Sequence, residues 1–263
     1  MAKIIHNAAG HNRYETGDDH GILFVMADAN STDKPDAVPA AALPSGAGGT
    51  PIEVADSLYE KGVAWEGLTA VTVSPSGADE TELWADNKKY GSFRAAEKFG
   101  ATIESYTYPE KFELCDGAAI VAGVRVGQQS RKKFGFFFRS KVGNDLNPDA
   151  GYKYHWIYNS TASPSEKSYA TVNDSPDAIT FSHEISADAV TIPSWSSLGL
   201  SADSTCEISI DSSTLDAGLK ANLDKVLAIT YGATNGVDGS TVDIDPQLLS
   251  PEDILKIMSA SAG

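Results

Sequence analysis

Aromatic side chains occupy every second position of one short segment: Tyr152, Tyr154, Trp156 and Tyr158. Successive side chains of a β-strand point to opposite sides of the sheet, so a period of two residues is typical of a strand with unlike faces. A row of large rings carries too much apolar surface to stay in water, and a second layer must cover it. This segment therefore predicts a packed β-structure.

Alternation of the same kind recurs along the chain, with turn-forming residues between the segments. It is found at 120–126, 134–139, 179–185 and 205–211, and further strands are expected at 21–27 and Leu68–Val73. A parallel sheet would need helical connections between its strands, and the sequence offers few. We therefore expect a mainly β fold, an antiparallel β-sandwich or barrel with long loops.

Two segments have helical character. Apolar residues at helical spacing in 215–227 predict an α-helix that flanks the sandwich. Near the C-terminus, Ser250 followed by proline and then Asp253 provides an N-cap, a first-turn proline and an early acidic residue, so a short helix is expected over Pro251–Ser259. The segment 92–99 fits either one helical turn or part of a strand.

Length and composition indicate one large domain. The chain has 263 residues, of which 41% are hydrophobic, and this is enough to fill a sizeable core. Two cysteines, Cys115 and Cys206, are too few for a disulfide scaffold, so both are expected to be free. The first residues lack the apolar stretch of a signal peptide, and no run of about 18 apolar residues is present to span a membrane. We expect a protein made and assembled in a cytoplasm.

Residues 30–50 interrupt the strand pattern. This stretch is rich in Ala, Pro, Gly and Ser, has no periodicity, and is longer than ordinary connections between strands. It is either a disordered insertion in the domain or an extended loop that orders only against a neighbouring subunit. A C-terminal extension is expected at about 232–263.

The charges are unevenly spread along the chain. The formal net charge is −16 at pH 7, basic residues gather between 125 and 141, and acidic residues dominate from 174 onward. Proteins that hold nucleic acid usually have the opposite balance, because Lys and Arg supply the affinity for phosphate. The chain is therefore not expected to grip DNA. On charge alone, the surplus acid is equally well explained by solubility.

Motifs for catalysis or metal binding are incomplete. Asp145, Asn147 and Asp149 have the spacing of a calcium loop, but Ala150 stands where the sharp turn needs glycine. The Gly-rich stretch 45–49 lacks the lysine of a phosphate-binding loop, and the histidines have no metal-ligand spacing. No nucleophile motif is present. The sequence therefore predicts a protein that is not an enzyme and uses no metal or cofactor.

Three blocks of sequence carry a family resemblance. They are ELWADNKKYGSFRAAEKFGATIESYTYPEKFELCDG (82–117), VRVGQQSRKKFGFFFRSKVGND (124–145) and GYKYHWIYNSTASPSEKSYATVNDSPDAITFSHEISADAV (151–190). In this order they resemble the major tail proteins of siphoviruses, the phages with long non-contractile tails. These proteins form the tail tube.

The resemblance implies a single β-sandwich domain of the tail-tube type with a flanking helix, six copies of which close into a ring. The sheets of the ring would join into an inner barrel, and stacked rings would form the conduit through which genome DNA leaves the capsid. Further partners would be a tape measure protein and a tail terminator. DNA would pass without specific binding, and the protein would act in the virion tail after assembly in the host cytoplasm, without a membrane.

An assembly of this kind needs interfaces that recognise each other and a lumen that does not bind phosphate. Unlike charges guide and align an interface, so the basic stretch is expected to pair across subunits with acidic surface. Its candidate residues are Arg131, Lys132, Lys133 and Arg139. Strand faces without Lys or Arg are candidates for the lumen. The acidic candidates on such faces are Glu184, Glu207 and Asp211.

Two other functions stay open from the sequence. An exposed aromatic row from Tyr152 to Tyr158 could be the stacking platform of a carbohydrate-binding module of a phage or bacterial surface protein. A hydrolase whose catalytic site the sequence does not reveal would need a pocket with convergent polar groups. Burial of the aromatic row would remove the first alternative and favour a structural role.

Overall fold

The computed structural model describes residues 12–44, 52–77, 79–94, 96–167, 169, 171, 178–234 and 243–260. Its strands are β1 Arg13–Val25, β2 Val63–Trp65, β3 Leu68–Val73, β4 Ser76–Gly77, β5 Glu80–Ala85, β6 Lys88–Arg94, β7 Glu97–Ser105, β8 Ala119–Val121, β9 Val124–Val126, β10 Phe134–Asn144, β11 Gly151–Ala162, β12 Phe181–Ala187, β13 Val190–Thr191, β14 Ser204–Thr205 and β15 Glu207–Asp211. The helices are α1 Ala217–Tyr231 and α2 Pro251–Ser259, and short 3-10 segments cover Ala40–Ala42, Glu110–Leu114 and Ser212–Thr214.

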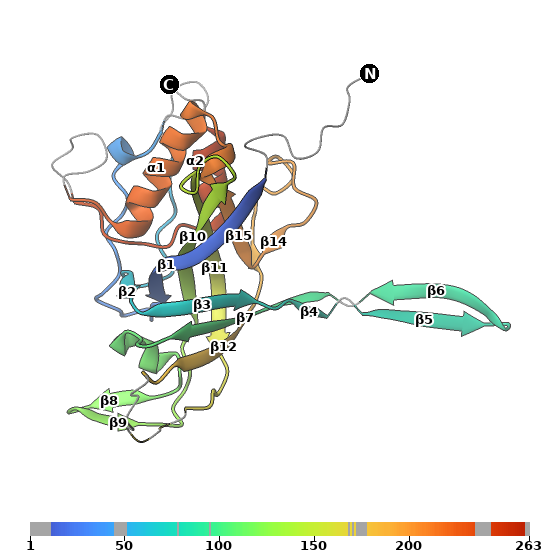
Figure 1. Ribbon diagram of the computed structural model, residues 1–263, viewed down its shortest axis with the longest axis horizontal. Coiled ribbons are helices and arrows are strands. Elements are labelled where there is room, and N and C mark those ends of the chain that lie inside the picture. Colours follow the sequence, from blue (N-terminus) through green and yellow to red (C-terminus); the bar gives the residue numbers. More distant parts are fainter. Residues whose placement is uncertain are drawn as a thin grey trace.

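One antiparallel sheet of nine strands folds into two layers. Its order is β2-β1-β10-β11-β12-β7-β3, with β15 added to β11 and β4 added to β7. Two strands pair with the same edge of β11: β15 pairs with residues 153–157, and β12 pairs with residues 160–162. In Figure 1 the layer of β1, β10, β11 and β15 stands upright, and the layer of β3, β7 and β12 crosses below it. Of the predicted alternatives, the antiparallel sandwich with a flanking helix is confirmed, and the described strands form no closed barrel.

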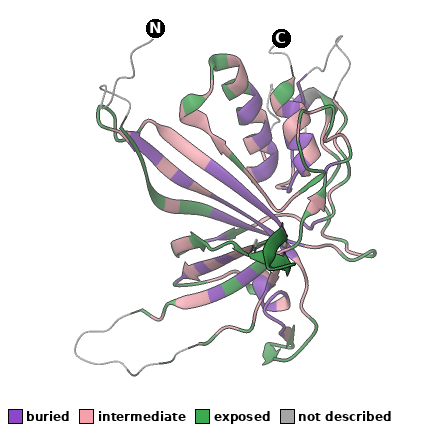
Figure 2. Cartoon of the chain, turned by 90° about the vertical axis from the view of Figure 1, so that its right-hand side faces the viewer, coloured by how far each residue is buried: buried purple, intermediate pink, exposed green. Residues whose placement is uncertain are grey.

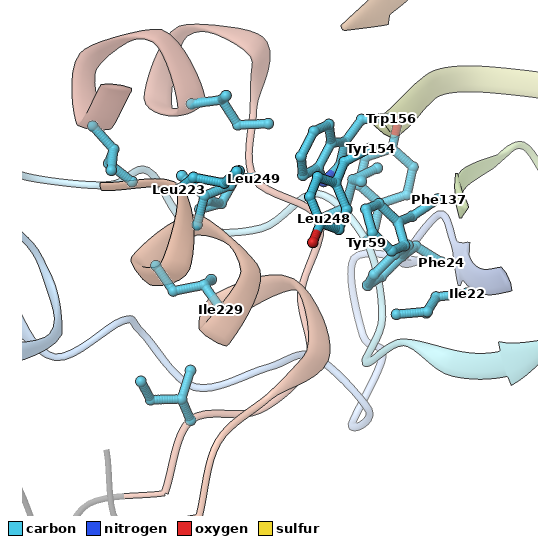
Figure 3. Close-up of a cluster of buried hydrophobic side chains, with 14 of the residues drawn as sticks. Ile22, Phe24, Tyr59, Phe137, Tyr154, Trp156, Leu223, Ile229, Leu248 and Leu249 are labelled. Carbon is cyan, nitrogen blue, oxygen red and sulfur yellow. The ribbon is translucent and has the colours of Figure 1, made fainter. Parts of the chain in front are cut away.

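Two hydrophobic cores lie on opposite faces of β1 and β10. The helix-side core fills the space between these strands and the helices, as Figure 3 shows, and its large buried side chains include Phe24, Tyr59, Phe137, Trp156 and Tyr158. The sheet-side core lies between the same strands and the lower layer, and includes Leu23, Trp65, Ile103, Phe112, Phe134, Phe136 and Ile157. In Figure 2 the buried residues run along the long strands between the helices and the lower layer.

Strand β10 is buried on both faces along its first half. Phe134, Phe136 and Phe138 belong to the sheet-side core, which confirms the alternation predicted for 134–139. Phe137 points the other way, into the helix-side core. The two cores therefore share this strand.

A β-bulge at Asn159 allows β11 to serve both layers. The register between β10 and β11 shifts at this point, and Asn159 has a left-handed φ of 49°, which asparagine tolerates better than most residues. Tyr158 lies in the helix-side core, whereas Ala162, beyond the bulge, lies in the sheet-side core. The backbone N–H of Asn159 donates to the hydroxyl of Tyr59 at 3.1 Å.

The aromatic row of β11 is covered by helix α1. Tyr154, Trp156 and Tyr158 are buried, and Tyr152 packs at the margin of the same core. The indole Nε1 of Trp156 donates to Oγ1 of Thr230, 3.3 Å away on α1. A carbohydrate-stacking platform must be open to solvent, so the burial of this row removes the feature that suggested a carbohydrate-binding module.

Both predicted helices are present. The side chain of Ser250 accepts a hydrogen bond from the backbone N–H of Asp253, which confirms the cap and the span of α2. Helix α1 begins after an Asp216 cap and continues to Tyr231, four residues beyond the expected end, where Gly232 with φ of 78° terminates it. The extra turn carries Ile229 into the helix-side core.

Three strand predictions are corrected. The first strand begins at Arg13 rather than at residue 21, because the polar residues before Gly21 continue the ladder with β10. Residues 120–126 form the hairpin β8–β9 instead of one strand, since Ala122 and Gly123 adopt left-handed φ values of 51° and 80° and reverse the chain. The ambiguous segment 92–99 belongs to strands β6 and β7 and contains no helical turn in its described residues.

The long loop and the C-terminal segment both contribute to the core. Ala42 and Leu43 are buried in the helix-side core, so this part of the loop packs on its own subunit, and residues 45–50 of the predicted loop lie outside the described residues. Leu248 and Ile254 of the expected C-terminal extension are buried in the same core. Residues 235–242 and 261–263 of that extension are likewise not described.

The structure bears on two expectations drawn from composition, the state of the cysteines and the presence of membrane-spanning segments. Both Cys115 and Cys206 are free; Cys115 is buried, and Cys206 lies just before β15 and is half-buried. None of the described helices has both the length and the apolar character needed to cross a membrane.

We expect a side chain at position 135 to destabilise the fold, because an ideal Cβ on Gly135 would lie 2.2 Å from Cδ2 of the buried Leu248. Gly135→Val should lower the free energy of unfolding by about 1–3 kcal/mol, measured by urea denaturation. Gly91→Ala is the matched control, since its Cβ would meet no atom within 4 Å; it should change stability by less than about 0.5 kcal/mol. An unchanged midpoint for Gly135→Val would contradict the tight packing described here.

Candidate assembly surfaces

The hairpin of β5 and β6 extends far beyond the body of the subunit (Figure 1). Within the described part of the chain, its two strands pair only with each other. The turn residues Asp86 and Asn87 have φ values of 50° and 59°. Two successive left-handed residues make a tight hairpin turn, and Asp and Asn accept this conformation with little strain. Local sequence therefore shapes a hairpin that the subunit does not support from the side.

This hairpin exposes large apolar side chains. Trp84 is 65% exposed, Tyr90 is 81% exposed and Phe93 is 65% exposed. An isolated two-stranded hairpin is marginally stable in water, and exposed aromatic groups of this kind mark protein–protein contacts. Ion pairs within the hairpin join Lys89 to Glu82 at 2.8 Å and support its shape. The described part of the subunit therefore leaves these side chains of the hairpin uncovered.

A second hairpin, β8–β9, leaves the lower layer at a different place (Figure 1). Its tip exposes Val121 and Val124, each by more than half. At its base the guanidinium of Arg125 donates to the carboxylates of Glu113 at 2.5 Å and Asp116 at 3.0 Å, both of which are buried. Buried carboxylates need a cation, so this contact ties the hairpin to the body.

The four predicted interface cations do not form a bare basic patch. Each is paired with an acidic residue of its own subunit: Arg131 with Asp116, Lys132 with Asp28, Lys133 with Asp188, and Arg139 with Asp19. The side chains of Asp28 and Asp188 are 72% and 71% exposed, and ion pairs in water contribute about 0–1 kcal/mol. Such pairs exchange partners at little cost. Pairing of these cations with a neighbouring subunit stays a prediction.

Arg139 is held more firmly than the two lysines. Its Nη2 donates to Oδ2 of Asp19 at 3.1 Å, and its guanidinium carbon lies 4.0 Å from the centroid of the Tyr152 ring. Burial would raise the pKa of Asp19, but the hydrogen bonds and charge of Arg139 outweigh burial and lower that pKa. Arg139 therefore closes the edge of the aromatic row within its own subunit.

The outer face of the lower layer is small, polar and acidic. Cross-strand pairing brings together two rows of residues on it, Thr72–Thr102–Glu184 and Ala70–Glu104–Ser182, which we call the acidic face. The alternate residues of these strands, such as Ile103 and Ile185, point into the sheet-side core. The lumen candidate Glu184 thus lies on a face whose two rows contain no Lys or Arg, and Lys98 follows beyond them along β7.

The other two lumen candidates lie elsewhere. Glu207 and Asp211 are on β15, where Glu207 approaches Nδ1 of His155 at 3.3 Å and Asp211 pairs with Arg13 at 2.7 Å. Lys153 of β11 stands opposite Asp211 in the ladder. This surface mixes both charges, so the structure does not bring the three candidates together.

An apolar pocket of about 390 Å³ opens beside the start of α2. Its walls come from residues 55–59, from Tyr158 and Asn159 at the bulge, from 189–190 and from 247–253. The hydroxyl of Ser250 accepts from the backbone N–H of Asp253 at 3.1 Å, so these polar groups serve the helix cap. Burial raises the pKa of the Asp253 carboxyl. The pocket is suited to receive apolar side chains, and no sequence pattern revealed it.

His183 lies in the sheet-side core inside a box of aromatic rings. The ring centroids of Trp65, Tyr108 and Phe112 are 6.0, 5.3 and 4.7 Å from that of His183. Neither ring nitrogen of His183 has a hydrogen-bond partner among the described residues. Burial lowers its pKa to about 4, and the opposing effect of Asp116 is smaller. The imidazole is therefore neutral in the folded protein at neutral pH.

Comparison with known proteins identifies no family. No protein-family model matches the chain, and no curated protein matches it. Among solved structures, the chain is similar to a chain in a cryo-EM structure of an extracellular contractile injection system, the PVC sheath-tube complex in its extended state. The identity is 16%, the match covers 47% of this chain and 85% of that one, and the TM-score is 0.25. A TM-score this low does not establish a shared fold.

Acidification should destabilise the fold through His183. As the pH falls from about 6.5 to about 4, the unfolded chain binds a proton at this residue and the folded chain does not. The free energy of unfolding should therefore fall by about 3 kcal/mol over this range. His183→Phe keeps a ring of similar size without a titrating group. Urea denaturation at several pH values should show a flatter pH dependence for the variant; equal losses in both proteins would exclude the imidazole as the cause.

Reversal of two surface charges tests the predicted interface. Lys132→Glu with Lys133→Glu should leave the thermal unfolding of the monomer nearly unchanged, since both pairs are exposed. Assembly followed by light scattering at low salt should slow by about tenfold, because long-range attraction speeds encounter. Lys34→Glu with Lys220→Glu changes the net charge equally at two other exposed sites and serves as control. Unchanged assembly kinetics at low salt would remove the predicted cross-subunit role.

Proposed function

We propose that this chain is the subunit of a phage tail tube of the siphovirus type, in which six copies close into a ring and rings stack into a conduit for DNA. The projecting β5–β6 hairpin is the observation that carries the proposal. It offers aromatic side chains to water at a distance from the described body of the subunit, where a second protein molecule could cover them. The first of the three sequence blocks that resemble tail-tube proteins, 82–117, includes most of this hairpin.

Tube assembly explains why one subunit needs unlike projecting and receiving surfaces. A ring of identical copies requires a patch on one copy that fits a different patch on the next, and stacking requires a second such pair that does not close. The hairpins β5–β6 and β8–β9 leave the body at different places and provide two separate projections (Figure 1). The inner barrel would form where the sheets of adjacent copies meet.

The acidic face supports a lumen role for the lower layer. DNA carries a dense row of phosphates, and inward Lys or Arg would bind them and slow passage. The acidic face offers Thr, Ser, Ala and Glu side chains instead, with Glu104 and Glu184 as its charges. We assign the lumen to this face, with Glu184 on it, and do not extend the assignment to Glu207 and Asp211, which lie among basic groups.

The proposed role is structural and not catalytic. The aromatic row that suggested carbohydrate binding fills the helix-side core, and Ser250 and Asp253 of the apolar pocket serve the cap of α2. The proposal includes no cofactor, a location in the virion tail after assembly in the host cytoplasm, and a tape measure protein and tail terminator as further partners. DNA passes without specific binding.

Electron microscopy of the purified protein tests the proposal directly. At high protein concentration we expect stacked rings or hollow tubes with sixfold symmetry. The tube map should place β3, β7 and β12 around the channel. A protein that stays monomeric at every concentration, or a tube with the acidic face on its outside, would contradict the proposal.

A single lysine in the lumen should make the tube retain DNA. Glu184→Lys replaces the charge that repels phosphates by one that attracts them, so tubes should bind a short duplex at least tenfold more tightly at low salt, with binding lost as salt rises. The assay is co-sedimentation of labelled duplex with assembled tubes. Asp203→Lys makes the same change at an exposed site away from the acidic face and is the control. Equal retention by both variants would place residue 184 outside the lumen.

A further inference from the structure

We infer that the apolar pocket beside α2 receives the tip of the β5–β6 hairpin from a second copy of the chain. This inference rests on the proposed tube assembly and names the two surfaces that meet. It follows from the shape and chemistry of both surfaces. In the single subunit the pocket is an open apolar cavity, and the aromatic rings at the hairpin tip are exposed to water. The pocket could enclose these rings.

The pocket is open, apolar and acidic at its rim. Its lining includes Met26, Leu58, Tyr59, Val190, Leu248 and Leu249. Leu58 belongs to this lining and is 68% exposed, so the cavity is continuous with apolar surface outside it. Asp56 is also exposed in the same loop. The volume of about 390 Å³ lies in the range of sites that hold groups of side-chain or ligand size.

The tip of the hairpin combines exposed aromatic rings with both charges, since Asp86 lies in the turn and Lys88 follows it. Trp84 and Tyr90 flank the turn and are exposed. Lys88, the first residue of β6, has no ion pair among the described residues, whereas Lys89 is paired with Glu80 and Glu82. A large ring next to a free cation fits an apolar pocket with a carboxylate at its mouth.

The hairpin cannot fill the pocket of its own subunit. Figure 1 shows its tip extended far to the side of the body, well away from α2, at whose start the pocket opens. The contact must therefore join two copies, with the hairpin of one in the pocket of the next. Such a head-to-tail contact repeats from copy to copy and propagates an assembly.

Among the described residues, the β8–β9 hairpin is a second projecting surface with exposed apolar side chains that could meet the β5–β6 tip. It exposes β-branched side chains, Val121 and Val124, on a narrow two-stranded ribbon. A ribbon has no concave surface to enclose a ring, whereas a pocket surrounds it and removes more apolar area from water. The pocket is therefore the better fit for the ring, and the β8–β9 hairpin serves as the alternative contact in the experiment.

Cysteine cross-linking in assembled tubes distinguishes a contact with the pocket from a contact with the β8–β9 hairpin. Cys206 is replaced by Ser, and the buried Cys115, whose pKa burial raises to about 12, remains as an unreactive thiol. Lys88→Cys is combined with Asp56→Cys at the pocket or with Val124→Cys at the β8–β9 hairpin, and an oxidant is added. We expect a ladder of covalent oligomers on a denaturing gel from the first pair, and none from the second pair or the single-cysteine variants.

The outcomes separate this inference from the proposed function. Tubes that are visible by electron microscopy, yet give no ladder from the pocket pair, overturn the pocket contact and leave the tube proposal standing. A ladder from the Val124→Cys pair, or equal ladders from the two cysteine pairs, likewise overturns the pocket contact and leaves the tube proposal standing. A parent protein that forms no rings or tubes contradicts the proposed function, and the inference falls with it.

A charge exchange provides an independent readout in protein that keeps its own cysteines. Lys88→Glu places two acidic groups at the contact and should raise the protein concentration needed for assembly by about tenfold. Adding Asp56→Lys should restore most of the lost assembly, because the acidic and the basic residue of the pair have then exchanged places. Lys34→Glu, at an exposed site outside both surfaces, controls for net charge. Failure of Asp56→Lys to restore assembly would overturn the contact.

Discussion

The fold depends on a strand that is buried on both of its faces. Phe136 of β10 packs against the lower layer while Phe137 packs against the helices, so the two cores share one piece of backbone. Burial of large rings on both sides supplies much of the stabilisation that an elongated subunit with exposed hairpins needs. The segment 247–253 completes this arrangement, since Leu248 fits only because residue 135 is glycine.

Local patterns in the sequence predicted the local elements. Alternation located the central strands, and Ser250 with Pro251 located α2, because both signals act within a few residues. The reversal in 120–126 was missed although Ala122–Gly123 marks it, since alternating valines on both sides suggested one strand. The second buried face of β10 was not predictable from periodicity, because only the distant helices create it.

The assembly surfaces were harder to predict than the fold. The basic stretch suggested an open patch, yet Lys132 and Arg139 find acidic partners 104 and 120 residues away. Glu184 and Glu207 looked equivalent in sequence, but strand order separates them onto different surfaces. Exposure of Trp84 could not be foreseen, because an aromatic residue in an alternating strand is usually buried. Such properties depend on which strands become neighbours.

The position of the pocket in the chain has a consequence for timing during synthesis. One wall of the pocket is formed by residues 247–253, which leave the ribosome after every strand of the sheet. The β5–β6 hairpin is complete much earlier. A growing chain can therefore display its hairpin before it can accept another, so under the proposed assembly a nascent chain becomes an acceptor only after residues 247–253 have emerged.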